Sequence, residues 1–367
     1  MKPVIKRGRR FVCWLVGEAL SQYRARIQEE YLTMETLAIY LKNHPHPGAR
    51  VYLSEDDLEL SFSALQKIYY EVARPLMPLF MRHWLQSRYT RAITCRPQFI
   101  CADLVELLKS DERAWNEFTT SLYPDSYTTS IILTHDVETQ KGYDFIPQVI
   151  ALEQRYGFRG SWNLVANKYR LHREITDLII RTGNEIGIHG YNHDGTCYYS
   201  EQRFLQRAVY INQALKKYGA VGFRSPQVHR NLRWLQHLDI LYDASCFDYD
   251  PYQPFPGGTG SIWPFMAGKF VELPYTVPQD HVLFYTIKKK DISIWKEKVK
   301  WLAANHGMVL TLTHPDYLQE KDHLKRYEDF LAYLKEVPDA WHCLPREMAQ
   351  WYKNLPDERE GSGFSGT

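Results

Sequence analysis

The chain has 367 residues, of which 44% are hydrophobic and 24% charged, so it can bury one large core or two smaller ones. Its formal net charge of +2 is close to neutral for this length, which argues against nucleic acid or an acidic polymer as a partner. Aromatic residues make up 14% of the chain, a content that suits a sugar-binding cleft, a large core or an interface equally well.

The first twenty residues, MKPVIKRGRRFVCWLVGEAL, join a basic run to an apolar run. The apolar part before Glu18 is too short to span a bilayer and lacks a small-residue cleavage site. The six cysteines form no CxxC pair, a pattern typical of reduced, intracellular proteins. We therefore expect a cytoplasmic protein. The basic terminus either contacts the inner membrane face peripherally or is frayed, with its apolar residues packed on the domain.

The first third of the chain predicts helices and contains no cluster of catalytic type. Helical patterns cover residues 23–43, 63–92 and 102–123, with breaks at NHPHPGAR and at prolines. We therefore divide the chain into a helical region of unknown role (1–125), a single barrel domain (126–355) and a flexible tail (356–367).

After residue 125, short β patterns alternate with amphipathic helices. The β patterns are TSIILTH, RGSWNLV, NEIGIH, AVGFRS and MVLTLTH. Residues 200–219 predict a helix that Ser200 caps and Gly219 terminates, and residues 291–307 predict another. This alternation indicates an α/β fold with parallel strands and covering helices, in which chemistry collects at the carboxyl ends of the strands.

Polar side chains follow most of these β patterns directly. They are His135, Asp136 and Glu138 in THDVE, His189 and His193 in HGYNH, Arg224 in FRSPQ, Asp243 in DAS, and His314 in LTHP. Each motif alone has an ordinary structural explanation, such as a helix cap or a core histidine. Their common position at strand ends predicts that they converge on one rim of a closed or nearly closed barrel.

In this order, the five motifs resemble those of the NodB-homology polysaccharide deacetylases, carbohydrate esterase family four, and most closely a bacterial subgroup with THDVET and ELPYT.PQDH. The resemblance covers residues 128–320. It implies a distorted (β/α) barrel around one divalent metal ion. The implied activity is hydrolysis of an N- or O-linked acetyl group on an amino sugar, polysaccharide or surface-glycan precursor.

The resemblance makes His189 and His193 the nitrogen ligands of the metal, with Gly190 allowing a sharp turn between them. Most family members carry adjacent acids in the first motif, whereas Val137 separates the acids here. Residues two apart in a strand point to the same side, so we assign Glu138 as metal ligand and Asp136 as general base. The exchanged assignment stays open. We expect zinc, with Co, Ni, Fe and Mn as alternatives.

The remaining motifs supply further roles. Arg224 is expected to pair with Asp136, and His314 to act as general acid with Asp243 orienting it. His135 is expected to point away from the metal, into the wall between strand and helix.

Substrate contacts are harder to assign, because Gln227 stands where the third motif usually has an aromatic residue. We name Tyr191, Gln227 and Trp263 as candidate substrate-binding residues, with a packed core aromatic as the alternative for Tyr191 and Trp263. Two other functions stay open. The chain is then either a catalytically silent carbohydrate-binding or assembly protein, or a hydrolase of a non-sugar amide.

Overall fold

The computed structural model describes residues 62, 64–78, 81, 99–110, 112–253 and 258–355. The expectations for the basic terminus, the first helical pattern and the tail at 356–367 therefore lie outside the described residues. Within the described ranges, each helix is either too short or too polar to cross a lipid bilayer.

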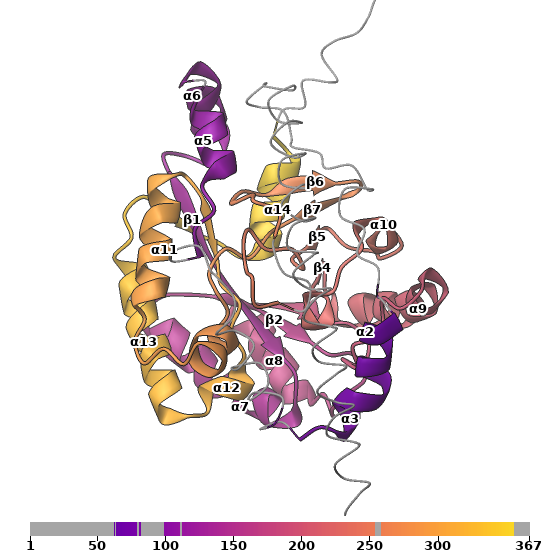
Figure 1. Ribbon diagram of the computed structural model, residues 1–367. Helices are drawn as coiled ribbons and strands as arrows, with labels where there is room; N and C mark the ends of the chain where they lie inside the picture. The colour runs from indigo at the N-terminus through magenta and orange to yellow at the C-terminus, as the bar shows by residue number, and fades with distance from the viewer. Residues whose placement is uncertain are drawn as a thin grey trace, which may run out of the picture.

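A mixed sheet forms the centre of the molecule (Figure 1). Its order is β6-β7-β5-β4-β3-β2-β1-β8, with β9 also beside β1. The pairs are parallel except for the antiparallel hairpin of β6 and β7. The strands are β1 (Thr129–Val137), β2 (Gly160–Leu164), β3 (Glu185–Ile188), β4 (Gly222–Phe223), β5 (Tyr242–Asp243), β6 (Phe265–Ala267), β7 (Phe270–Glu272), β8 (Met308–Leu310) and β9 (Ala340–His342).

An irregular segment after β7 joins the two sides of this sheet. Tyr275 donates its N–H to the carbonyl of Cys246, beyond β5, while Thr276 and Val277 donate theirs to Leu310 in β8. These bonds replace a regular ladder and satisfy the backbone groups at the gap. The sheet is thereby a distorted (β/α) barrel, which confirms the predicted fold class.

Helices cover the outside of the barrel (Figure 1). The expected helix at 200–219 is α9: Ser200 accepts the N–H of Arg203, and Gly219 ends it in the left-handed conformation with φ +59°. The helical elements are α2 (Ala64–Ile68), η1 (Tyr69–Ala73), α3 (Arg74–Leu76), α5 (Asp103–Lys109), α6 (Glu112–Ser121), α7 (Gln140–Arg155), α8 (Arg173–Arg181), α9 (Glu201–Tyr218), η3 (Pro226–Val228), α10 (Leu232–Leu235), η4 (Val282–Thr286), α11 (Ser293–Ala304), α12 (Pro315–Leu318), α13 (Lys321–Lys335) and α14 (Pro345–Lys353).

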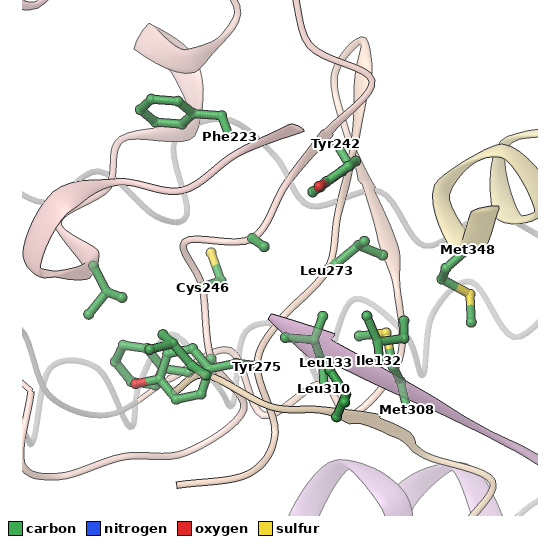
Figure 2. Close-up of a cluster of buried hydrophobic side chains, with 14 of the residues drawn as sticks. Ile132, Leu133, Phe223, Tyr242, Cys246, Leu273, Tyr275, Met308, Leu310 and Met348 are labelled. Atoms are coloured by element: carbon green, nitrogen blue, oxygen red, sulfur yellow. The ribbon is translucent and has the colours of Figure 1, made fainter. Parts of the chain in front are cut away.

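The core lies between the strands and these helices. Figure 2 shows Ile132 and Leu133 of β1 beside Met308 and Leu310 of β8, with Met348 of α14 nearby, and all five are buried. Each buried side chain of this size contributes about 1.5–3 kcal/mol. Every residue of β1 is buried, which explains why the apolar residues Ile131, Ile132 and Leu133 follow one another instead of alternating with polar ones.

The helical elements before the barrel lie at its two ends. The segment formed by α2, η1 and α3 contacts the start of α9, because Tyr199 donates to the Lys67 carbonyl and Arg203 lies 3.7 Å from Glu71 (Figure 1). In contrast, α5 and α6 lie at the end where β1 begins, and α7 and α12 lie where it finishes.

Candidate active site

The end of β1 separates its side chains into two groups. His135 points outward: its Nε2 lies 2.8 Å from Glu153 of α7, its Nδ1 bonds Thr313, and its ring stacks on Trp162. This confirms the expectation that His135 faces the wall between strand and helix. Asp136 lies on the inner side of the strand and is buried.

Three side chains that we predicted as metal ligands come together at this end of the barrel. Glu138, His189 and His193 each offer one ligand atom, and these atoms lie within 4.8 Å of one another. The Nε2 of His193 is 2.9 Å from Glu138 Oε1. Gly190, with φ +68°, allows the turn, and a Cβ there would lie 2.5 Å from Pro226.

The donor set fits a divalent metal ion. His189 donates its Nδ1–H to the carbonyl of Arg224 at 3.0 Å, which leaves Nε2 as the free nitrogen, buried and without a hydrogen-bond partner. Burial lowers the pKa of His189 to about 4, so its ring is neutral at pH 7, as a ligand must be. Two imidazoles and one carboxylate are a donor set that leaves coordination positions open for catalysis.

Gln227 holds the second imidazole. Its amide Nε2 lies 3.0 Å from His193 Nδ1, while its Oε1 is buried without a partner. With the amide nitrogen and oxygen exchanged, Oε1 accepts the His193 Nδ1–H, which leaves His193 Nε2 with its lone pair for a metal ion. The structure thus places Gln227, a candidate for substrate binding, in contact with a candidate metal ligand.

Asp136 is held by two neighbours. Its Oδ1 accepts from Asn163 at 2.9 Å and from Arg224 at 3.3 Å, and its Oδ2 lies 3.7 Å from His189 Nε2. Burial alone raises the pKa of Asp136, but attraction to the cationic forms of His189, Arg224 and His314 outweighs it and leaves the pKa below its usual value. At pH 7, where His189 is neutral, Arg224 and His314 carry these charges. Arg224 therefore lies beside Asp136 as expected, fully buried, and also donates to Thr134.

Asn163 is a site residue that our reading of the sequence missed. It belongs to β2, and a Cβ on Gly187 of the neighbouring strand would lie 2.1 Å from its Oδ1. Gly187 therefore provides the space in which the Asn163 amide reaches Asp136. The signal was present in SWNL, where Ser161 and Asn163 alternate with apolar residues in a buried strand.

His314 is oriented by Asp280, not by Asp243. Asp280 Oδ1 lies 2.7 Å from His314 Nδ1, and its Oδ2 accepts the His314 backbone N–H at 2.7 Å. His314 Nε2 is thereby turned to within 3.9 Å of Glu138 Oε1. Burial lowers the pKa of His314, but the Asp280 carboxylate and the nearby acids raise it to about 9 overall.

The prediction that Asp243 orients His314 is wrong. Asp243 accepts the backbone N–H and the hydroxyl of Ser245, and it pairs in register with Glu272 of β7. Burial raises the pKa of both carboxyls. Asp243 is therefore part of the buried wall, and the PQDH segment, which we had noted only as a subgroup feature, supplies the carboxylate instead.

The three candidate substrate residues separate in the structure. Tyr191 and Gln227 line a narrow pocket beside His193. The prediction for Trp263 is wrong, because its ring packs on Phe118 at 5.1 Å and its Nε1 donates to the His306 carbonyl. Phe118 belongs to α6, so Trp263 is buried at the end of the barrel where β1 begins.

Comparisons with known proteins agree with this architecture. No family model and no curated protein matches the sequence. Among solved structures, a Mycobacterium smegmatis protein assigned to the polysaccharide deacetylases is 17% identical, with a TM-score of 0.52 over 64% of this chain and 94% of that one. A Pseudomonas aeruginosa PAO1 protein with the same assignment is 14% identical, with a TM-score of 0.49 over 65% and 94%.

PuuE allantoinase is a further match among solved structures, at 14% identity and a TM-score of 0.48 over 63% of this chain and 92% of that one. The likeness to the Mycobacterium smegmatis protein spans nearly all of that protein. The chain therefore contains a domain with the NodB-like polysaccharide deacetylase fold.

Proposed function

We propose that this protein is a metal-dependent deacetylase that hydrolyses an N- or O-linked acetyl group on an amino sugar, polysaccharide or surface-glycan precursor. The observation that carries the proposal is a pair of groups on either side of the candidate metal ligands. Asp136 is held ionised by Arg224, and His314 is held protonated by Asp280. Hydrolysis of an acetyl group requires an ionised base and a protonated acid at the same pH. The lowered pKa of Asp136 and the raised pKa of His314 provide this pair.

In this proposal, Glu138, His189 and His193 hold the ion, which when bound acidifies water and polarises the acetyl carbonyl. Asp136 takes a proton from the attacking water, because its carboxylate is ionised and already fixed by Asn163 and Arg224. His314 delivers its Nε2 proton to the departing nitrogen or oxygen.

The pocket beside His193 supports a role in binding the sugar. Tyr191, which lines this pocket, is fixed by two contacts. The Tyr191 hydroxyl accepts a hydrogen bond from the Asn167 amide, and the Tyr191 ring stacks on Tyr210 with the ring centres 5.0 Å apart. Aromatic rings of this kind pack against the apolar faces of sugars. We propose that Tyr191 contacts the sugar, whereas Gln227 contributes by holding His193.

Release of acetate from a panel of N- and O-acetylated sugars and small amides tests the proposal. Protein loaded with zinc should release acetate from sugars faster than from the small amides. Preferred hydrolysis of the amides would instead favour the non-sugar hydrolase. If sugars bind but no acetate is released with zinc, cobalt, nickel, iron or manganese, the protein is a silent binder and the proposal fails.

A further inference from the structure

The helical segment before the barrel places one side chain against the pocket beside the metal ligands. Tyr70 is the buried residue of η1, whereas the next two residues, Glu71 and Val72, are exposed. The turn is π-helical, because the N–H of Arg74 bonds the Tyr69 carbonyl five residues earlier, and such turns are frequent at functional sites. The turn therefore presents Tyr70 to the barrel and leaves its neighbours in solvent.

Tyr70 contacts two loops of the candidate metal site. Its hydroxyl shares a hydrogen bond of 3.0 Å with His229 Nε2, and the two rings meet edge to face with their centres 5.1 Å apart. The Tyr70 ring also lies over Gly195, where an added Cβ would be 2.7 Å from the ring and 3.2 Å from Gln227 Oε1. Gly195 follows the ligand His193 by two residues, and Gly195 and His229 both line the pocket. One side chain thus touches the loop of His193 and the loop of Gln227.

Both loops hold residues in a backbone conformation that favours glycine. The angle φ is +55° at His193 in the first loop, and +54° at Gln227 and +49° at Val228 in the second. A positive φ is uncommon for any residue with a Cβ, and for a β-branched residue such as valine it is an outlier. Such conformations cost free energy and persist where the surrounding structure holds them. The two loops therefore depend on contacts that neighbouring elements supply.

Gln227 connects the second loop to the metal ligands. Its amide lies 3.0 Å from His193 Nδ1, so a shift of this loop moves the group that contacts the imidazole. His229 follows Gln227 by two residues and is buried. The Tyr70 hydroxyl therefore anchors the second loop at His229, while the Tyr70 ring supports the first loop at Gly195.

The segment that carries Tyr70 is itself attached to the barrel. The Tyr199 hydroxyl donates to the Lys67 carbonyl at 3.1 Å. The Phe62 ring packs on the rings of Tyr199 and His229, with centres 5.1 Å and 4.8 Å apart. These contacts on either side of Tyr70 in the sequence of the segment and the barrel fix where its ring and hydroxyl lie.

We propose that Tyr70 is a positioning residue of the metal site, and that the helical segment before the barrel is thereby part of the active site. This inference rests on the metal site of the proposed deacetylase and assigns it a further residue. Tyr70 acts through His229, Gly195 and Gln227, and not by contact with the reacting atoms.

Zinc affinity and the absorption spectrum of the cobalt-substituted protein test this role. Tyr70→Phe keeps the ring and removes the hydroxyl, so the second loop loses its anchor at His229. We expect zinc affinity to fall about tenfold, as for other residues that support metal ligands. We also expect the visible bands of bound cobalt, which report the geometry of its ligands, to shift. Tyr127→Phe is the matched control, because Tyr127 is exposed near the opposite end of β1 and loses the same hydroxyl.

A second variant tests the same hydrogen bond from its other end. His229→Phe should shift the cobalt bands as Tyr70→Phe does, and the double variant should be little worse than either single one. All variants are compared below the onset of urea unfolding, so that loss of the fold does not imitate loss of the metal. Zinc affinity and cobalt bands in Tyr70→Phe that equal those of wild type and Tyr127→Phe overturn the inference. A wild type that binds neither metal overturns it as well.

Acetate release by the same proteins separates this inference from the proposed function. If the wild type releases acetate from N-acetylglucosamine while Tyr70→Phe is unaltered in zinc affinity and cobalt spectrum, the deacetylase stands and the positioning role fails. If Tyr70→Phe shifts the cobalt spectrum while the wild type releases acetate from no acetylated sugar or amide, the positioning role stands and the deacetylase fails.

Discussion

Asp280 binds His314 through both of its carboxylate oxygens, one to the imidazole Nδ1 and one to the backbone N–H, each at 2.7 Å. Asp280 lies on the segment between β7 and α11, and His314 follows β8. The two bonds fix the ring so that Nε2 faces the candidate metal ligands. They also stabilise the imidazolium, and the pKa of His314 is accordingly raised to about 9.

The first prediction concerns the alkaline limit of activity. A general acid works only while protonated, so activity should fall as pH rises through the raised pKa of His314. Asp280→Asn removes the carboxylate that raises this pKa and should move the alkaline limb of the kcat/KM profile to lower pH. Asp177→Asn, which changes an exposed acid on α8, is the control. An unchanged alkaline limb in Asp280→Asn would show that His314 is not the acid.

Arg224 supports a prediction about stability. It is fully buried and bonds Asp136, Thr134 and the Ala244 carbonyl. Arg224→Met leaves a buried carboxylate unpaired, so we expect the free energy of unfolding to fall by about 3–5 kcal/mol. Urea denaturation measures the change. Arg155→Met, which breaks an exposed ion pair with Glu328, should cost less than about 1 kcal/mol, and an equal loss in both variants would contradict the assigned role of Arg224.

Asn163 and Gly187 give a linked pair of predictions. Asn163→Ala removes a hydrogen bond to the Asp136 carboxylate, and we expect kcat to fall by roughly 10- to 100-fold because bonds to charged groups are strong. Gly187→Ala should lower kcat similarly, because the new Cβ occupies the space of the Asn163 amide. The double variant should be little worse than either single one. Additive losses in the double variant would mean that Gly187 acts elsewhere.

Gln227 is expected to control metal affinity. Gln227→Leu deprives His193 of its Nδ1 partner, and zinc affinity should fall about 10- to 100-fold. Gln227→Glu keeps an oxygen acceptor and should retain zinc. Competition with a chromogenic chelator measures both, with the exposed Gln350→Leu as control. Equal zinc affinity in wild type and Gln227→Leu would contradict this orienting role.

The regular part of the fold was predictable from the sequence. The apolar residues of β1 indicate a buried strand by their composition. The capped amphipathic pattern of α9 indicates a helix by its period. The hairpin of β6 and β7 and the strand β9 were not predicted, because three residues are too few to show a period of two. The equally short β8 was predicted because its residues begin the longer run MVLTLTH. Likewise, α11 begins at Ser293 rather than at Asp291, because the Asp291 side chain accepts the Ser293 N–H just before the helix.

The site was predictable where a residue follows a strand end and less so elsewhere. Glu138, His189 and His193 come together because parallel strands end on the same rim. Asp280 was missed because it lies in an irregular segment with no strand directly before it, and Asp243 was chosen because it ends a short strand and begins the DAS motif. Trp263 is near the motifs in sequence only, since the chain crosses to the other end of the barrel before β6.

The central claim is that Asp136 acts as the base and Glu138 as a metal ligand. We test it most directly by measuring metal content together with acetate release in Asp136→Asn and Glu138→Ala. The exposed Asp144→Asn serves as control. Asp136→Asn should keep its zinc and lose turnover, because its carboxylate acts as base, whereas Glu138→Ala should lose both because a ligand is gone. Retention of zinc by Glu138→Ala together with its loss from Asp136→Asn would contradict the account and exchange the roles of the two acids.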